Sequence, residues 1–452
     1  MMRLCVKMYR TVPRSGQFVF FFGVFLAAVL GMLWFHYAHA DTAWYNSSWG
    51  YRVKITVDHT KVGSDLTNFP VYVNLSNMPA SFWTHVKSNG GDIRITESDG
   101  VTEVSREVVA ISASTKTGEV WFKAPALSSS TDYGFYIYYG NASASDYAYT
   151  DTYGRNAVWS DYLGVWHMNN ITAVVDSTGG GNDIHFTSGL AAMTTSPYGD
   201  AVRLYPNGTK DISIATSTPI SSNQNYTYSV TARHNASMTQ YYGIADTRQG
   251  GSDSAGIKIM AQGTQTASVG VVSNSNAFCS FGSTVTWSTS AWANFTVSTT
   301  VGTGQQTAYM NGSSIGGAAN CTRGTGNRGV GLLTGLSSSM DFSQVFVRAG
   351  LSSAAWISTH YKNESSASTF YSVGTEETAP VSPTAPTSTI MSSVHYRIFD
   401  SDISSAGLDS STSTHYRLSD TLGQFSSGPS TSTSYNLHAG YRHMATSTAS
   451  SS

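Results

Sequence analysis

Strict alternation of apolar and polar residues is the feature that most limits how this chain can fold. Tyr51–Val57, Phe69–Leu75 and Tyr133–Tyr139 each carry an apolar side chain at every second position. Such alternation puts one face of a strand in a core and the other in water. Turn sequences rich in Gly, Asn and Asp separate these segments. The pattern predicts several short strands, and hence a β-sandwich over residues 42–150.

A second β-rich region follows at residues 158–376. Asn311 and Gly312 come directly after the strand-like segment Gln306–Met310, and both residue types tolerate the positive φ angles of a tight hairpin. One short helix is predicted at Ser353–Tyr361, with a serine at its start as a cap. The region is predicted to form a second sandwich.

The composition changes after this region. Residues 377–392 hold Pro380, Pro383 and Pro386 among Ser and Thr, which indicates a semi-extended linker. Residues 393–444 form a weak tyrosine repeat that is either hairpin-like or disordered. The predicted fold class is therefore all-β: two consecutive β-sandwich (jelly-roll) domains after an N-terminal apolar segment, then a linker and a short repeat tail.

Residues 1–40 have the order of a secretory signal. They contain no acidic residue, carry four basic residues within the first 14 positions, and continue with an apolar run at 18–35 that ends near Ala38-His39-Ala40. Cleavage after Ala40 is predicted. The alternative is an uncleaved N-terminal anchor, because the apolar run has about the length that spans a bilayer. In both cases the rest of the chain is extracellular or at the cell surface, and any membrane contact is through this segment.

Composition narrows the partners further. Charged residues make up 12% of the 452 residues, about half of the usual share of roughly 25%. No clustered basic region is present in the sequence, so binding to nucleic acid is not expected. Beyond Cys5, the cysteines are Cys279 and Cys321, an even pair in an oxidising compartment. A disulfide between them is predicted, and two separate thiols are the alternative.

The glycine-rich stretch Val174–Phe186 is the one candidate ligand loop. It lacks the Gly-Lys-Ser/Thr of a phosphate loop and the third glycine of a dinucleotide site. Asp176, Asn182 and Asp183 offer hard oxygen ligands, which suit Ca²⁺. The alternative is a structural turn in which the aspartate accepts backbone hydrogen bonds. Either no cofactor or a calcium ion is expected.

Residues 42–147 resemble a bacterial and archaeal extracellular domain family of unknown function. The matching motifs, in order along the chain, are Trp44-Tyr45, Ser48–Arg52, Asn68–Val71, Gly91–Arg94 and Tyr138–Asn141. The resemblance implies export and a sandwich fold. It brings no catalytic residue.

Residues 158–376 resemble the laminin-G-like (concanavalin A-like lectin/glucanase) jelly roll. The matching segments are Gly164–Met168, Asp176–Gly179 with Asn182-Asp183, Trp292–Val297, Tyr309–Gly312, and Trp356–Tyr361 with Phe370–Gly374. Some members of that family hold calcium near the aspartate turn. This sequence departs from them: Ser343 stands where relatives have an Asp, Asp341 is two residues out of register, and Asn170 replaces a Glu. The departures favour the structural turn.

No catalytic constellation is predicted. Glycosidases of the jelly-roll family use paired carboxylates on one strand. The only similar spacing here is Glu97, Asp99 and Glu103, and Ser98-Asp99-Gly100 indicates a turn that would separate them. His167 has no nucleophile or orienting acid at a supporting distance in sequence, and it is interpreted as a packed strand histidine. The chain is predicted not to be an enzyme.

The sequence thus favours a lectin-like binding or adhesion protein that recognises a polysaccharide or a cell-surface protein. Aromatic side chains would stack on sugar faces while Asn, Ser and Thr bind hydroxyls. Tyr241-Tyr242 and residues 249–254 are candidates for such contacts. A structural envelope or stalk component is the alternative, and a glycoside hydrolase is the least favoured interpretation.

Overall fold

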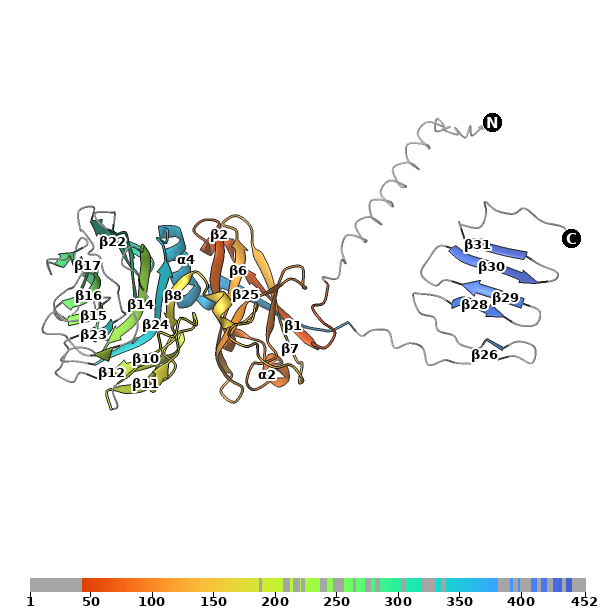
Figure 1. The fold of residues 1–452 in the computed structure, drawn as a ribbon, viewed down its shortest axis with the longest axis horizontal. Coiled ribbons are helices and arrows are strands. Elements are labelled where there is room, and N and C mark those ends of the chain that lie inside the picture. The colour runs from red at the N-terminus through yellow and green to blue at the C-terminus, as the bar shows by residue number, and fades with distance from the viewer. Residues whose placement is uncertain are drawn as a thin grey trace, which may run out of the picture. The chain divides into compact units, whose positions relative to one another are not determined.

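The computed structural model describes residues 43–186 and 339–380 without a break, residues 189–334 with gaps, and six short strands between 391 and 440. The chain divides into two compact units, Met1–Ala379 and Pro380–Ser452. The first unit contains antiparallel sheets stacked as two β-sandwiches (Figure 1). The predicted all-β fold is confirmed.

The first sandwich packs a five-stranded sheet against a three-stranded one. The larger sheet has the order β25-β1-β7-β3-β4, with β1 at Tyr51–Val57, β3 at Arg94–Glu97, β4 at Glu103–Val104, β7 at Tyr133–Tyr139 and β25 at Tyr371–Thr378. The smaller sheet has the order β2-β6-β5, with β2 at Leu66–Asn74, β5 at Arg106–Ser112 and β6 at Thr117–Leu127. Three short helical segments lie between these strands or near them: η1 at His59–Lys61, η2 at Leu75–Asn77 and α2 at Phe82–His85.

The edge strand β25 is a departure from the predicted domain boundary. Residues 158–376 were predicted to belong to the second sandwich, yet β25 pairs with β1, from Tyr51 opposite Thr378 to Val57 opposite Tyr371. The reason is that β1 already pairs with β7 on its other side and would otherwise present an open edge. The chain therefore returns from the second sandwich to close the first.

The second sandwich consists of two larger sheets. One has the order β11-β12-β24-β14-β20-β21-β22, with β8 also paired to β24; its strands are β8 Tyr162–Trp166, β11 Ala191–Ser196, β12 Gly199–Leu204, β14 Tyr226–His234, β20 Ala293–Thr299, β21 Gln306–Met310, β22 Ser313–Ala318 and β24 Met340–Ala349. The other has the order β13-β23-β15-β16-β17-β18, with β19 also paired to β17; its strands are β13 Ile212–Ser213, β15 Tyr242–Asp246, β16 Gly256–Gln262, β17 Thr266–Val272, β18 Phe278–Ser280, β19 Val285–Thr286 and β23 Gly331–Thr334. The short strands β9 Ala173–Val174 and β10 Ile184–His185 pair with each other.

Two local predictions in this region are confirmed. Asn311 and Gly312 have φ angles of 52° and 73° and join β21 to β22. The predicted helix is α4 at Ala354–Ser365, and the Ser353 side chain accepts a hydrogen bond from the Trp356 backbone N–H as its cap. The helix is one turn longer than predicted, and α5 at Ala367–Phe370 leads from it into β25.

The two sandwiches share a buried layer. In β6, Val120 and Phe122 face the core of the first sandwich, so the residue between them, Trp121, faces outward. The Trp121 ring contacts the rings of Trp159 and Phe346, with centroids 5.3 and 5.6 Å apart. One continuous cluster of buried apolar side chains contains residues of both sandwiches in this layer. The outer face of the small sheet is therefore buried, although simple alternation predicts that it meets water.

The second unit has a simpler arrangement. Its strands β28 Leu408–Thr412, β29 Tyr416–Asp420, β30 Ser426–Ser432 and β31 Asn436–Gly440 form one antiparallel sheet, and β26 Met391–Ser392 pairs with β27 Arg397–Ile398. This agrees with the predicted hairpin-like tail. Within the described part of the chain, no helix is long and apolar enough to cross a membrane.

Candidate functional site

Three charged side chains meet in the layer between the sandwiches, and strand alternation puts them there. Glu119 and Trp121 lie two residues apart in β6 and share its outer face. Glu107 of β5 is opposite Trp121 in the strand register. His167 directly follows Trp166 at the end of β8. Because Trp166 is in the core of the second sandwich, the next side chain points toward the first.

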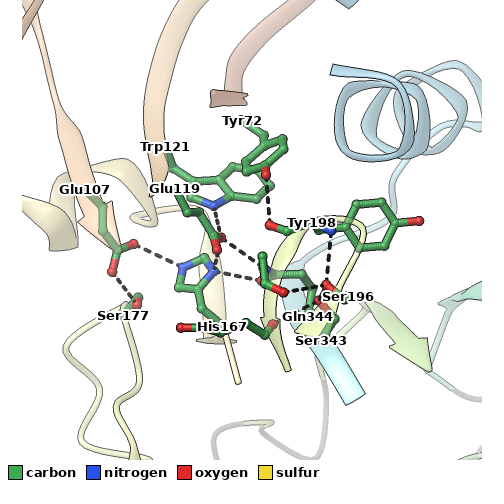
Figure 2. A network of polar contacts seen from close by, with 12 residues as sticks. Tyr72, Glu107, Glu119, Trp121, His167, Ser177, Ser196, Tyr198, Ser343 and Gln344 are labelled. Atoms are coloured by element: carbon green, nitrogen blue, oxygen red, sulfur yellow. Dashed lines mark hydrogen bonds and ion pairs between the residues drawn. The ribbon is translucent and has the colours of Figure 1, made fainter. Parts of the chain in front are cut away.

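These residues form a closed network, which we call the His167 network: His167, Glu107, Glu119 and Gln344 (Figure 2). His167 Nε2 lies 3.2 Å from Glu107 Oε2, and Nδ1 lies 2.8 Å from Gln344 Oε1 and 3.3 Å from Glu119 Oε1. Gln344 Nε2 donates to Glu119 Oε1 at 2.9 Å. The imidazolium is thus held between carboxylates from two strands of one sandwich while itself belonging to the other.

Neutral donors supply further hydrogen bonds to both carboxylates. Glu107 accepts hydrogen bonds from Trp159 Nε1 at 2.5 Å and Ser177 Oγ at 2.7 Å. Glu119 Oε1 accepts one from Trp121 Nε1 at 2.7 Å. Buried charges are tolerated only when they are paired and hydrogen-bonded in this way.

The contacts within the network determine the ionisation of His167 and Glu107. Burial alone would lower the pKa of His167, but the adjacent Glu107 and Glu119 outweigh it and raise the pKa to about 10. Burial alone would raise the pKa of Glu107, yet the charge of His167 and the hydrogen bonds hold it below its ordinary value. His167 is therefore a cation at neutral pH, and both ring nitrogens donate.

A second histidine–glutamate pair lies in the same layer on α4. His360 Nδ1 and Glu364 Oε2 are 3.7 Å apart. Among the described residues, Glu364 Oε1 and His360 Nε2 have no hydrogen-bond partner. Burial, with the charge of Glu119, raises the pKa of Glu364 to about 8. Burial, with the charge of Arg348, lowers the pKa of His360 to about 3. Both side chains of this pair are uncharged at neutral pH.

A cleft of about 430 Å³ opens beside Glu107, and we call it the Tyr149 cleft. Tyr149 on its wall is 59% exposed, which is unusual for an aromatic side chain. The Arg155 guanidinium lies over the Tyr149 ring, 5.3 Å from its centroid. Other lining residues are Arg106, Asp146, Asn169, Asn170 and Ser177. The cleft combines a flat aromatic face with donors and acceptors.

A second cleft of about 480 Å³, the Asp200 cleft, lies on the Glu119 side of the network. Its wall carries the hydroxyl groups of Ser112, Thr117 and Ser196 together with Glu119 and Asp200. Burial, with the charge of Glu119, raises the pKa of Asp200. This cleft is acidic, whereas the Tyr149 cleft carries two guanidinium groups.

The hydrogen bonds of the predicted ligand loop are those expected of a structural turn. Asp176 is buried, and its carboxylate accepts hydrogen bonds from the backbone N–H of Val165 and from the backbone N–H and hydroxyl of Thr178. Asn182 Nδ2 donates to it at 2.9 Å. Asp183 instead accepts from the backbone N–H of Asp176. Asp176, Asn182 and Asp183 therefore use their polar groups on each other and on β8.

The turn also positions a residue of the network. The Ser177 backbone N–H donates to the Val165 carbonyl at 2.9 Å, which directs Ser177 Oγ toward Glu107. Gly179 has a φ of 79°, and a Cβ there would lie 2.2 Å from Asn156 Nδ2. Only glycine fits this position without displacing the neighbour. The turn therefore holds β8 and the Ser177 side chain in position for the network.

The residues predicted to depart from the jelly-roll pattern make other contacts. Asp341 is fully buried and accepts hydrogen bonds from Arg203 and Arg233. The Ser343 hydroxyl pairs with Ser196 at 2.7 Å. Asn170 Oδ1 accepts from the backbone N–H of Thr172. None of these partners belongs to the Asp176 turn.

The spaced carboxylates Glu97, Asp99 and Glu103 do not converge. Asp99 caps a turn by accepting from the Thr102 and Val101 backbone N–H groups. Glu97 accepts from the Tyr133 hydroxyl, while Glu103 accepts from Tyr45 and Tyr147. The predicted separating turn at 98–100 is present, with Gly100 at a φ of 78°.

Several predicted sites lie outside the described residues. Ala40 and Cys321 are among them, as are Tyr241 and residues 249–254. The backbone of Cys279 lies in β18. The signal cleavage and the Cys279–Cys321 disulfide therefore stay predictions.

Fold and site together define an all-β protein of two fused β-sandwiches with a buried charge network and two clefts at their junction. Residues 89–154 match the model of a family described as "Domain of unknown function (DUF2341)", in agreement with the resemblance predicted for 42–147. No curated protein matches. The resemblance of the second sandwich to laminin-G-like jelly rolls stays a prediction.

Solved structures with a similar arrangement are distant. The binding domain of Paraclostridial Mosquitocidal Protein 1 is 12% identical, with a TM-score of 0.38 over 45% of this chain and 52% of that one. The Botulinum Neurotoxin Type G receptor binding domain is 13% identical, with a TM-score of 0.36 over 45% and 51%. A Trypanosoma rangeli sialidase in complex with the inhibitor DANA is 12% identical, with a TM-score of 0.34 over 44% and 32%. The chain spans about half the length of the two binding domains.

Proposed function

We propose that this chain is an extracytoplasmic, non-catalytic binding protein that recognises a glycan, and that the Tyr149 cleft holds the ligand. The observation that carries the proposal is the exposed ring of Tyr149 on the wall of a polar cleft. Aromatic rings stack on the apolar faces of sugars, and amide, hydroxyl and guanidinium groups bind their hydroxyls. The basic and apolar N-terminal segment supports export.

The cleft is also preorganised, which favours binding. Ser177 and Glu107 on its wall are fixed by the His167 network. A wall that does not reorganise loses less conformational freedom when a ligand binds. This moves the proposed site from the jelly roll alone to the junction of the two sandwiches.

The test is calorimetric titration with a panel of soluble polysaccharides, using the wild type and Tyr149→Ala. Loss of the stacking face is expected to weaken binding about tenfold, which corresponds to about 1.4 kcal/mol. Tyr205→Ala is the matched control, because Tyr205 is 39% exposed but does not line the cleft. Equal affinities for all three proteins would refute the site. Release of reducing sugar in the same mixtures would refute the non-catalytic assignment.

A structural envelope component is the second candidate, and the shared apolar cluster favours it. One cluster contains residues of both sandwiches, and β25 ties the end of the second to the edge of the first. Two sandwiches fused in this way make a stiff spacer. Retention in envelope extracts by a protein that binds no polysaccharide, unchanged in Tyr149→Ala, would support this candidate over the first.

A further inference from the structure

Two guanidinium groups in the Tyr149 cleft have unused hydrogen-bonding capacity. Arg106 is 2% exposed; its Nε donates to the Ile93 carbonyl and its Nη1 pairs with Asp146 at 2.6 Å. Its Nη2 is buried without a partner among the described residues. Because this nitrogen is closed off from the cleft, Arg106 contributes positive charge to the wall rather than a contact to a ligand.

The second guanidinium is that of Arg155, the first residue of α3 at Arg155–Val158. Only its Nε has a hydrogen bond within the described residues, a long one of 3.5 Å to Asn156 Oδ1. Stacking over Tyr149 holds the group at the cleft wall. Its two terminal nitrogens remain for a ligand.

The acidic groups of the cleft, by contrast, are already engaged. Both oxygens of Glu107 accept hydrogen bonds, and His167 neutralises its charge. Asp146 Oδ1 accepts from Arg106 and from the Tyr147 backbone N–H. The wall thus offers cationic donors in excess, on a chain whose formal net charge is -2.

We infer that the Tyr149 cleft selects an anionic sugar unit, whose carboxylate or sulfate oxygens accept from the Arg155 guanidinium while its ring lies against Tyr149. This rests on the proposed function and adds the class of ligand to it. Guanidinium groups bind such oxyanions through paired hydrogen bonds. A neutral sugar lacks the charge that pairs with the Arg155 guanidinium, which disfavours it.

The experiment compares matched pairs of polymers by calorimetry at low and physiological salt. Polygalacturonate is set against its carboxyl-reduced form, and heparin against its desulfated form. The acidic member of at least one pair is expected to bind at least tenfold more tightly, and the pair that discriminates identifies carboxylate or sulfate. Equal binding within both pairs would overturn the inference while leaving glycan binding intact. No binding to any polymer would overturn both proposals.

Substitutions localise the effect. Arg155→Gln is expected to remove at least tenfold of the affinity for the acidic polymer and to weaken binding of the neutral one less, because a neutral sugar loses a hydrogen-bond donor but no charge pairing. Arg155→Lys should be intermediate, because it keeps the charge but loses the paired geometry. The control is Lys116→Gln, which removes the same charge from the exposed turn between β5 and β6. If Lys116→Gln weakens binding as much as Arg155→Gln, adsorption by general charge is the explanation and the inference fails. Circular dichroism of each variant checks that it is folded.

Discussion

Two histidine–glutamate pairs lie in one buried layer, and they have opposite ionisation. In the first, His167 and Glu107 are 3.2 Å apart, and hydrogen bonds and charge hold both ionised. In the second, His360 and Glu364 are 3.7 Å apart, and burial keeps both neutral. The residue types and the depth are the same. The difference is the set of neighbours.

Hydrogen-bond donors, rather than burial, therefore decide whether a side chain stays charged between the sandwiches. Glu107 receives N–H and O–H groups from Trp159 and Ser177. Glu364 Oε1 receives none from the described residues. A buried carboxylate without donors takes up a proton instead. The first pair therefore joins the two sandwiches through charged hydrogen bonds, while the second pair contributes only as buried, neutral side chains.

The largest expected effect is from removing the cation of the first pair. His167→Ala leaves Glu107 and Glu119 buried without their counter-charge, which should cost about 3–5 kcal/mol of the free energy of unfolding. His360→Leu in the second pair should cost less than about 1.5 kcal/mol, because it is close to a volume-conserving replacement of a neutral side chain. Urea unfolding measures both. Equal losses would show that the two pairs do not differ.

The pH dependence of stability should separate the pairs next. Glu364 keeps its proton when folded up to about pH 8 but loses it near 4.5 when unfolded, so its contribution is lost as the pH rises through 8. His360 is the reverse: its contribution is present above 6.5 and is lost as the pH falls toward 3. The two cancel between pH 4.5 and 6.5. His167 stays protonated when folded up to about pH 10, so it adds to the loss above 6.5.

The free energy of unfolding is thus expected to be flat from pH 4.5 to 6.5. From 6.5 to 8 it should fall by up to roughly 2.7 kcal/mol per pH unit, the effect of two protons. Glu364→Gln should halve this slope, because it removes one of the two titrating groups. Urea unfolding at pH 5.5, 6.5 and 7.5 is sufficient. A slope that Glu364→Gln leaves unchanged would contradict the assignment of a neutral Glu364.

The sequence predicted the elements better than their junction. Period-two alternation located β1, β2 and β7 because one face of each is in a core. The same rule puts the other face of a strand in water, so it could not show that a second sandwich covers this face of β6. Glu119, two residues before Trp121, was the available signal in the sequence. A carboxylate and a tryptophan on the same strand face indicate that another part of the chain covers this face.

The site was harder to predict because its parts are distant in sequence. Glu107 and His167 are 60 residues apart, and His167 and Gln344 are 177 apart. His167 was interpreted as a packed strand histidine; it is packed, but it is also the charged centre of a network. The Asp176 turn was singled out from its own residues alone, because its donors are local.

That turn supplies the next prediction, since the buried Asp176 carboxylate accepts its hydrogen bonds from neutral donors. Asp176→Ala leaves several of those donors unpaired and should cost about 1–3 kcal/mol of the free energy of unfolding. Asp176→Asn should cost less, because one oxygen remains as an acceptor. Chelator should not change the melting temperature of the wild type. A calcium-reversible drop on chelation would restore the metal interpretation, since saturation at about a hundred times the dissociation constant adds about 2.7 kcal/mol.

The smallest effect is expected at the surface, where a third histidine–carboxylate pair tests the role of burial. His59 Nδ1 lies 2.6 Å from Asp132 Oδ1, closer than either buried pair, with Asp58 beside it. The Asp132 side chain is 54% exposed, so water already solvates the charges and competes for the contact. Asp132→Asn is therefore expected to leave the unfolding midpoint unchanged within the error of the measurement. A loss comparable to that of His167→Ala would mean that proximity alone, rather than burial with donors, determines the strength of these pairs.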